Sequence, residues 1–252
     1  MPRRLIVVLC LAALATATCT SSGSPTPPSP PAQASITPAS PSSRYHPAID
    51  PANFVKTVDN PHLPWIPGTT WVYKGVSEGE RELNRVFVTH GTKEILGVAA
   101  TVVHDQVFRK GELVEDTFDW YAQDREGNVW YFGEDTRELE NGKVVSTEGS
   151  WESGVDGAQP GILMPADPQV ADSFRQEFYQ GHAEDMAWFL SLNRSISVPY
   201  GSFKHAILTV EWTPLEPKIF GLKYYVSGIG MVEEANAAGP KETSSLVSVT
   251  KP

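Results

Sequence analysis

The chain contains only two cysteines in 252 residues, and both lie near its start. Cys10 falls within an apolar segment that we expect to be removed, which leaves Cys19 alone. The exported domain therefore has no disulfide, no thiol nucleophile and no zinc or iron–sulfur site built on cysteine. It must be stabilised by its own hydrophobic core, which a domain of about 200 residues can provide.

Sequence motifs that name a reaction are also missing. The six histidines are scattered and form no H-E-x-x-H pattern, and the chain has no G-x-S-x-G elbow. It likewise has no glycine-rich phosphate loop and no dinucleotide fingerprint. We therefore expect no cofactor and no metal ion. The sequence leaves catalysis open but favours a non-catalytic protein.

Positive charge is scarce. The chain has 20 Lys and Arg against 30 Asp and Glu, and without Arg3 and Arg4 the balance is 18 against 30. Nucleic acids need lysine and arginine for their phosphates, so this balance argues against a nucleic-acid partner. It argues equally against electrostatic attachment to anionic lipid headgroups.

The N-terminus has the order of an export signal. Arg3 and Arg4 precede an apolar run over residues 5–17, which is too short to span a bilayer comfortably. Cys19 and a segment rich in Ser, Thr and Pro follow. We predict a signal peptide over residues 1–19, a disordered tether over 20–44 and a β-rich globular domain over 45–252.

The processing point has two interpretations. Cleavage before Cys19 would free this residue for lipidation with a diacylglyceryl group and palmitate-type chains, as in bacterial lipoproteins. Cleavage after Ala17 would instead release a secreted protein. The tether directly after Cys19 favours the lipid anchor, because an anchored domain needs a spacer. We expect an exported protein that is anchored to the cell membrane, or otherwise secreted.

The pattern of the domain predicts a series of β-strands joined by short turns. Runs rich in β-branched and aromatic residues alternate with turns, of which residues 124–127 and Asn141-Gly142 are the clearest hairpin signals. Residues 184–187 predict one short helical turn. The predicted fold class is mainly β: a single antiparallel curved sheet, or half-barrel meander, with one short helical segment.

Four stretches carry a resemblance. Residues 60–73 (NPHLPWIPGTTWVY) form a Pro-Gly turn and a W-x-Y strand, and VPYGSF at 198–203 precedes YYVSGIGMV at 224–232. With residues 116–161, they resemble an uncharacterised family of actinobacterial lipoproteins and secreted proteins. That group in turn resembles the curved half-barrels of the lipoprotein-carrier (LolA/LolB-like) type. The resemblance implies a sheet around an apolar concavity and implies no activity.

Acidic side chains are the first candidates for chemistry. Ten of them lie within residues 112–140, where Asp124, Glu126 and Asn128 have the spacing of calcium ligands, although a hairpin turn and a solvated face explain the same pattern. Glu134, Asp135 and Glu184 are the candidate catalytic carboxylates, since paired carboxylates can perform acid–base chemistry.

Aromatic side chains are the second candidates. Trp120-Tyr121 and Trp130-Tyr131 are adjacent pairs on predicted strands, so one ring of each pair must face away from the other. At least one face of this hairpin should therefore present rings to a pocket or partner. We take Trp120, Trp130 and Tyr131 as candidate ligand-binding residues.

These observations favour an extracytoplasmic, membrane-anchored lipoprotein that binds a small apolar or amphiphilic ligand or an envelope protein. Two alternatives remain open at this point: an extracytoplasmic enzyme that depends on carboxylates, and a structural envelope lipoprotein without a ligand.

Overall fold

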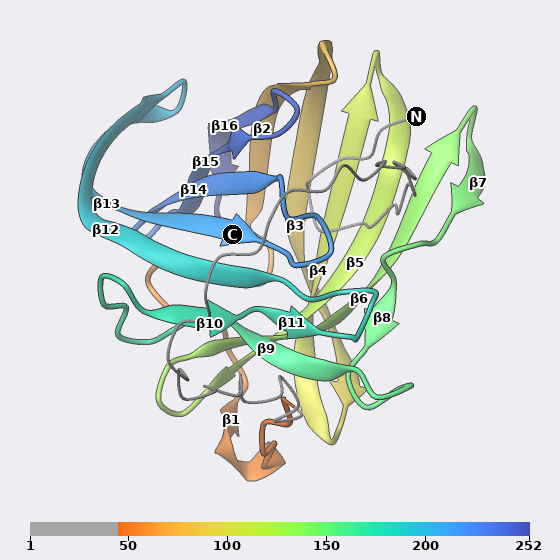
Figure 1. The fold of residues 1–252 in the computed structure, drawn as a ribbon, viewed down its shortest axis with the longest axis vertical. Helices are drawn as coiled ribbons and strands as arrows, with labels where there is room; N and C mark the ends of the chain where they lie inside the picture. The colour runs from red at the N-terminus through yellow and green to blue at the C-terminus, as the bar shows by residue number, and fades with distance from the viewer. Residues whose placement is uncertain (1–44) are drawn as a thin grey trace, which may run out of the picture.

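The computed structural model describes residues 45–252, which form one strongly curved antiparallel sheet (Figure 1). The first elements are η1 (Pro51–Asn53), β1 (Phe54–Val55), β2 (Thr70–Ser77), β3 (Glu80–Ile95), β4 (Val98–Arg109), β5 (Glu112–Asp124), β6 (Val129–Glu140), β7 (Lys143–Ser146) and β8 (Trp151–Glu152). The others are β9 (Gln159–Met164), β10 (Ser173–Arg175), β11 (Glu177–Phe178), β12 (Met186–Val198), β13 (Gly201–Trp212), β14 (Phe220–Val226), β15 (Gly230–Ala238) and β16 (Thr243–Thr250).

The strand order follows the chain in two runs. Strands β2 to β6 are neighbours in sequence order, and so are β12 to β16. Strand β16 joins the runs by pairing with β2, where Leu246 lies opposite Tyr73. The predicted antiparallel meander is therefore confirmed, and the sheet curves further than a half-barrel.

The sheet almost closes on itself at one short segment. Strand β10 lies at one end of the strand order and β11 at the other, yet only Gln176 separates them in sequence. The backbone N–H of Gln176 bonds to the carbonyl of Asp185 at 2.8 Å. A Cβ at Gly161 would lie 2.2 Å from the Gln176 carbonyl carbon, so glycine is what lets β9 approach this seam.

Both predicted hairpin turns are present. Asn141 and Gly142 have φ values of 52° and 72°, as a two-residue turn with left-handed backbone requires. In the other turn, one carboxylate oxygen of Asp124 accepts the backbone N–H groups of Glu126 and Asn128 at 3.0 and 2.9 Å. The turns thus set the register of β5–β6 and β6–β7.

The helical turn expected over residues 184–187 is wrong. Strand β12 begins at Met186, and its side chains alternate: Ala187 and Phe189 are buried, whereas Trp188 and Leu190 are exposed. The apolar residues satisfied a helical period as well as a strand period, and pairing with β10 and β13 decided the outcome. The one helical element of residues 45–252 is the 3₁₀ turn η1.

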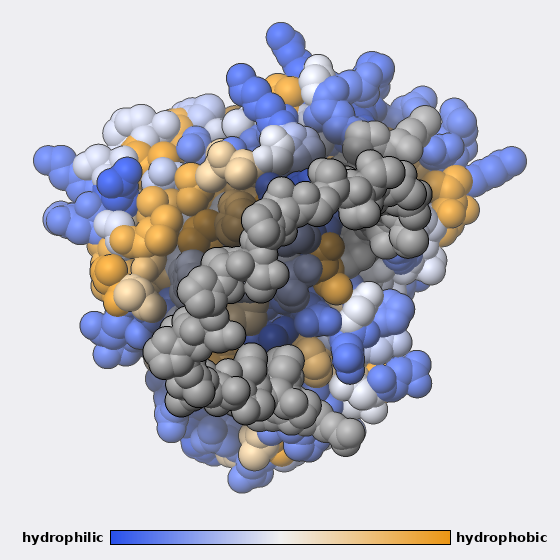
Figure 2. All heavy atoms as spheres, in the orientation of Figure 1, coloured by the Kyte–Doolittle hydropathy of each residue, from blue (hydrophilic) through white to orange (hydrophobic). Residues whose placement is uncertain are grey.

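The sheet has an apolar cluster on each face. The larger cluster lies inside the curve and includes Trp71, Tyr121, Tyr131 and Phe189. The smaller, outer cluster consists of Ile95, Val98, Ala100, Trp120, Ala122 and Phe132, with Ile49, Phe54, Val102 and Trp130 packed against it. On the molecular surface, hydrophobic side chains gather on the β12–β13 side of the face in Figure 2, within a largely polar rim.

Candidate functional site

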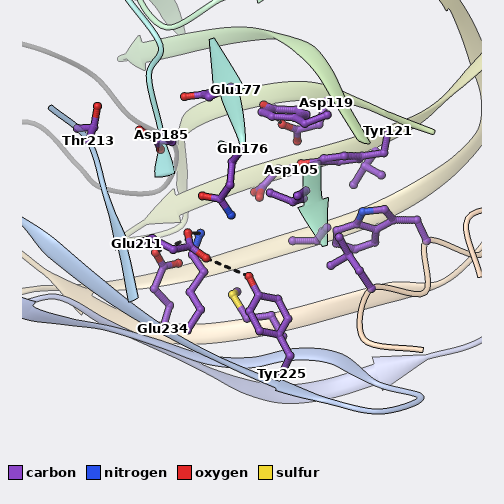
Figure 3. Close-up of a pocket in the computed structure, with 18 of the residues that line it drawn as sticks. Asp105, Asp119, Tyr121, Gln176, Glu177, Asp185, Glu211, Thr213, Tyr225 and Glu234 are labelled. Carbon is purple, nitrogen blue, oxygen red and sulfur yellow. Dashed lines mark hydrogen bonds and ion pairs between the residues drawn. The ribbon is translucent and has the colours of Figure 1, made fainter. Parts of the chain in front are cut away.

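The inner cluster does not fill the space inside the curved sheet. A cavity of about 130 Å³ remains there, and aromatic and acidic side chains line it together (Figure 3). Its lining includes Leu63, Trp65, Tyr73, Val86, Val103, Asp105, Asp119, Tyr121, Tyr131, Leu163, Gln176, Glu177, Asp185, Glu211, Trp212, Thr213, Ile219, Lys223, Tyr225, Met231 and Glu234. We treat this interior cavity as the candidate site.

Strand alternation and one β-bulge determine which side chains of β5 and β6 face the cavity. Asp119 and Tyr121 face the cavity, while Trp120 between them belongs to the outer cluster. On β6 the pairing jumps, because Gly133 lies opposite Trp120 whereas Tyr131 lies opposite Tyr121. This bulge sends Phe132 outward and makes room for Gly133 at φ 130°.

Aromatic rings form one wall of the cavity. Tyr121 stacks on Trp65 and on Tyr131, with ring centroids 5.5 and 4.9 Å apart. Trp151 meets Tyr131 edge-on at 5.3 Å, and Trp71 meets Trp65 in the same way at 5.2 Å. These contacts fix the ring planes, so the wall presents a rigid apolar surface.

The one lysine of the lining is already paired. The Lys223 ammonium lies 2.7 Å from Glu211 and 3.8 Å from Glu234. Burial alone would lower the pKa of Lys223, but these two carboxylates raise it well above its usual range. Glu211 also accepts the Tyr225 hydroxyl at 3.2 Å. Lys223 is therefore a fixed positive charge that belongs to Glu211 and Glu234.

Asp119 and Asp105 have hydrogen-bond donors but no ion pair to Lys223. Asp119 accepts the Tyr131 hydroxyl at 2.8 Å, and Asp105 accepts the Asn84 amide at 2.6 Å. Burial raises the pKa of Asp119 to about 6, although the Tyr131 hydroxyl opposes the shift. Burial, with repulsion from Asp119, also raises the pKa of Asp105.

Glu177 is the least satisfied carboxylate. It is only 1% exposed, and neither of its side-chain oxygens has a hydrogen-bond partner. Burial raises the pKa of Glu177 to about 8; the nearby Trp151 indole, which forms no well-aligned hydrogen bond, and Lys223 oppose that shift. Asp185 also has an oxygen without a partner, and burial followed by repulsion from Glu177 raises its pKa.

The three predicted catalytic carboxylates do not come together. Glu134 is buried beside the site, where burial and repulsion from Asp119 raise its pKa. Asp135 lies on the solvent side, 2.7 Å from Arg137. Glu184 accepts the backbone N–H of Gly181 at 2.8 Å, and its neighbour Asp185 is the residue that lines the cavity.

The three predicted ligand-binding rings separate as well. Tyr131 lines the cavity, whereas Trp120 and Trp130 pack on the outer face. The expectation that the rings of each adjacent pair face opposite ways is met, and the tyrosine of each pair is the inward one. A ligand-binding role stays a prediction for Tyr131, and it does not extend to the outer tryptophans through this cavity.

The acidic hairpin uses its own donors. The second carboxylate oxygen of Asp124 accepts Asn128 Nδ2 and the Trp130 indole N–H, both at 2.8 Å. A turn thus accounts for the spacing that resembled a calcium loop. Within residues 45–252, no group of three or more His, Cys, Asp or Glu side chains is arranged to hold a metal ion.

Sequence reasoning missed several charged residues of the cavity. Glu177, Glu211 and Lys223 come from separate segments and match no motif. One signal was available: Glu211 follows the largely apolar run AILTV of β13, and Lys223 lies between apolar and aromatic residues of β14. A charged residue at an inward strand position marks a paired core group or a site.

No protein-family model and no curated protein matches the sequence. Two solved structures are similar in shape. One is a protein of Bacteroides fragilis, inferred to be exported and with a YmcC-like fold: 14% identity, TM-score 0.44, 75% of this chain and 99% of that one covered. The other is inferred to be a lipoprotein of Parabacteroides distasonis: 12% identity, TM-score 0.41, 75% and 98% covered. Likenesses this distant leave function to be argued from the cavity.

The predicted anchor and tether lie outside the described residues, and so does Cys19. No helix of residues 45–252 has the length and hydrophobicity needed to cross a bilayer.

Proposed function

We propose that this chain is an exported, non-catalytic binding protein whose interior cavity holds a small amphiphilic ligand. The observation that carries the proposal is the mixed lining of the cavity. Rings of Trp65, Tyr121 and Tyr131 meet carboxylates such as Asp119 and Glu177 around unfilled space. A core built only for stability excludes such space and such groups.

The size of the cavity limits the ligand. An apolar cavity of about 150 Å³ is enough to bind benzene, whereas drug-sized ligands need about 300–1,000 Å³. The interior space of about 130 Å³ thus suits one ring, or a short chain of similar volume, with a polar group attached. A whole phospholipid or a lipoprotein acyl group would require the seam at Gln176 to open.

Titration of the purified full-length protein with benzyl alcohol tests this proposal. Saturable binding should raise the melting temperature and change the fluorescence of Trp65, which lines the cavity. Trp65→Phe and Trp212→Phe together should remove most of the fluorescence change, because both rings line the cavity. Trp188→Phe is the matched control, because this ring is 45% exposed and does not line the cavity.

Absence of saturable binding, by either measurement, would overturn the ligand proposal. A structural role, or an envelope protein as partner, would then be the better account.

The proposed location rests on Cys19. Wild-type protein should partition into detergent with lipid attached, and Cys19→Ala should be released or stall in processing. An unlipidated mature N-terminus at Thr18 would contradict the anchor and leave a secreted protein.

An extracytoplasmic enzyme is the second candidate, and one observation favours it. Two carboxyl groups of the same cavity have separated pKa values, about 6 for Asp119 and about 8 for Glu177. Acid–base catalysis uses such pairs, in which one group is charged and the other protonated. This alternative predicts turnover of a bound compound that Glu177→Gln abolishes, whereas the binding proposal predicts recovery of the compound unchanged.

A further inference from the structure

Acidic groups in the cavity outnumber basic groups by a wide margin. Within the described part of the chain, six carboxyl groups line the cavity against one ammonium group, that of Lys223. Glu211 and Glu234 already surround Lys223. Asp105, Asp119, Glu177 and Asp185 line the cavity without an ion-pair partner among residues 45–252.

Glu177 gives an independent sign that something is to be bound. It is 99% buried, lines the cavity and has two side-chain oxygens without a hydrogen-bond partner. Asp185, which sits across from it in Figure 3, adds a third such oxygen. Buried polar groups are normally satisfied, because an unsatisfied carboxylate loses its hydration without compensation.

We infer that the ligand of this cavity is an organic cation, a small amine or ammonium compound whose charged group lies among Asp119, Glu177 and Asp185 and whose apolar part lies against Tyr121 and Tyr131. This inference rests on the proposed function and specifies the ligand class for the same cavity. The charge supplies what the carboxylates lack, and the rings of the aromatic wall cover the apolar part of the ligand.

An organic cation fits better than either alternative occupant. The cavity acids are not gathered tightly enough to form a metal site within residues 45–252. An ammonium group with an apolar body is larger and reaches carboxylates on separate segments of the chain. Water could donate hydrogen bonds to Glu177 but carries no charge to stabilise ionised carboxylates, and it would gain nothing from the aromatic wall.

Three probes of nearly one shape test the inference: benzylamine, benzyl alcohol and benzoate. Each has a ring that matches the cavity volume, and they carry positive, zero and negative charge. Isothermal titration calorimetry at pH 8, with the purified full-length protein, should show benzylamine binding at least about tenfold more tightly than benzyl alcohol. Benzoate should not bind.

Two variants locate the ammonium group. Glu177→Gln and Asp185→Asn should each weaken benzylamine about tenfold while leaving benzyl alcohol within about twofold. Asp135→Asn is the matched control, since that carboxylate lies on the outer face beside Arg137. Circular dichroism of each variant shows whether the strands are retained, and retained benzyl alcohol binding shows that the cavity is intact.

The pH dependence provides a further readout. The titratable and charged groups that face Glu177 are Asp119, Tyr121, Tyr131, Glu134, Asp185 and Lys223. A cation binds the ionised carboxylates, so benzylamine affinity should rise from pH 6 to pH 8.5 with release of protons. Benzyl alcohol affinity should not rise.

Each outcome decides between the two proposals. Equal affinities for benzylamine and benzyl alcohol would overturn the cation and leave the proposed function standing. No binding of any probe would overturn both. Binding of calcium in place of benzylamine, with loss in Glu177→Gln, would overturn the organic cation in favour of a metal ion.

Discussion

The inner and outer faces of β5 and β6 carry alternating residues of the same two strands. They differ in how closely their side chains pack and in how many acidic groups they bury. The outer face packs Trp120, Trp130 and Phe132 beneath Phe54 of the N-terminal segment, and its one indole contact to an acid, from Trp130 to Asp124, is a satisfied hydrogen bond. The inner face sets Tyr121 and Tyr131 beside carboxylates and leaves a cavity. Adjacent residues of one strand therefore serve different ends.

The difference indicates where stability and function lie. Removing a side chain from a close-packed apolar cluster lowers the free energy of unfolding strongly. Buried carboxyl groups beside an unfilled cavity already lower it in the wild-type protein. Substitutions on the outer face should therefore destabilise the fold and spare binding. Substitutions of the inner carboxylates should weaken binding without destabilising the fold.

Phe132→Ala should have the largest effect. This ring is fully buried in the outer cluster, 5.6 Å from the Phe54 ring. Its removal should lower the free energy of unfolding by about 4 kcal/mol in chemical denaturation, from lost burial and a new cavity. Binding of benzylamine by the folded fraction should be unchanged. Val145→Ala, at an exposed site, is the control and should stay within about 0.5 kcal/mol. Lost binding in folded Phe132→Ala would break the division between the faces.

Glu177→Gln should act in the opposite direction. Burial raises the folded-state pKa of Glu177 from 4.5 to about 8, so the folded protein holds a proton that the unfolded chain releases. Stability from this group is complete below about pH 4.5 and is lost as pH rises through about 8. The empty variant should therefore gain on the order of 3 kcal/mol at pH 9 and almost nothing at pH 4.

Denaturation curves at several pH values measure this gain. The comparison with Asp135→Asn removes the effect of overall charge, because both variants lose one negative charge. A Glu177→Gln variant that is less stable than wild type at pH 9 would mean that the carboxylate has a stabilising partner.

Local features of the sequence were enough to predict the sheet. The turn at Asp124 is stabilised by its own carboxylate, and Asn141-Gly142 adopts left-handed backbone easily, so both hairpins depend on neighbours in sequence. The alternation of Trp120 with Tyr121 placed the rings on opposite faces. It did not say which face was inside, because that depends on how the whole sheet curves.

The candidate site depended on long-range closure. Glu177 and Asp185 reach the cavity because Gln176 crosses the seam between the two ends of the sheet, and Glu211 arrives from β13. No local pattern records such a meeting. Of the neighbouring residues Glu184 and Asp185, only Asp185 lines the cavity, since a one-residue step in an extended segment reverses the direction of a side chain.

Tyr131→Phe should have a smaller effect than either variant above. The substitution keeps the ring and removes the hydroxyl that donates to Asp119 at 2.8 Å. The free energy of unfolding near pH 8 should fall by about 1–2 kcal/mol, because the hydrogen bond goes to a charged acceptor. The pKa of Asp119 should rise further, which carbon-detected NMR of the carboxyl group can follow. An unchanged pKa would show that the hydroxyl does not support the carboxylate.

Asp135→Asn should have the smallest effect. Its neighbour Glu134 is buried, so the two residues test the outer and the inner face of β6 at adjacent positions. Both ion-pair partners, Asp135 and Arg137, are more than 40% exposed, so the 2.7 Å contact should contribute at most about 0.5 kcal/mol. The loss should vanish in 1 M salt, where charges on the surface are screened.

Glu134→Gln should instead stabilise the empty protein above neutral pH, since burial, with repulsion from Asp119, raises the pKa of Glu134. The enzyme alternative predicts that either variant abolishes an activity without changing stability. Equal stability responses in the two variants, at all pH and salt values, would show that β6 does not separate an outer face from an inner one as the comparison requires.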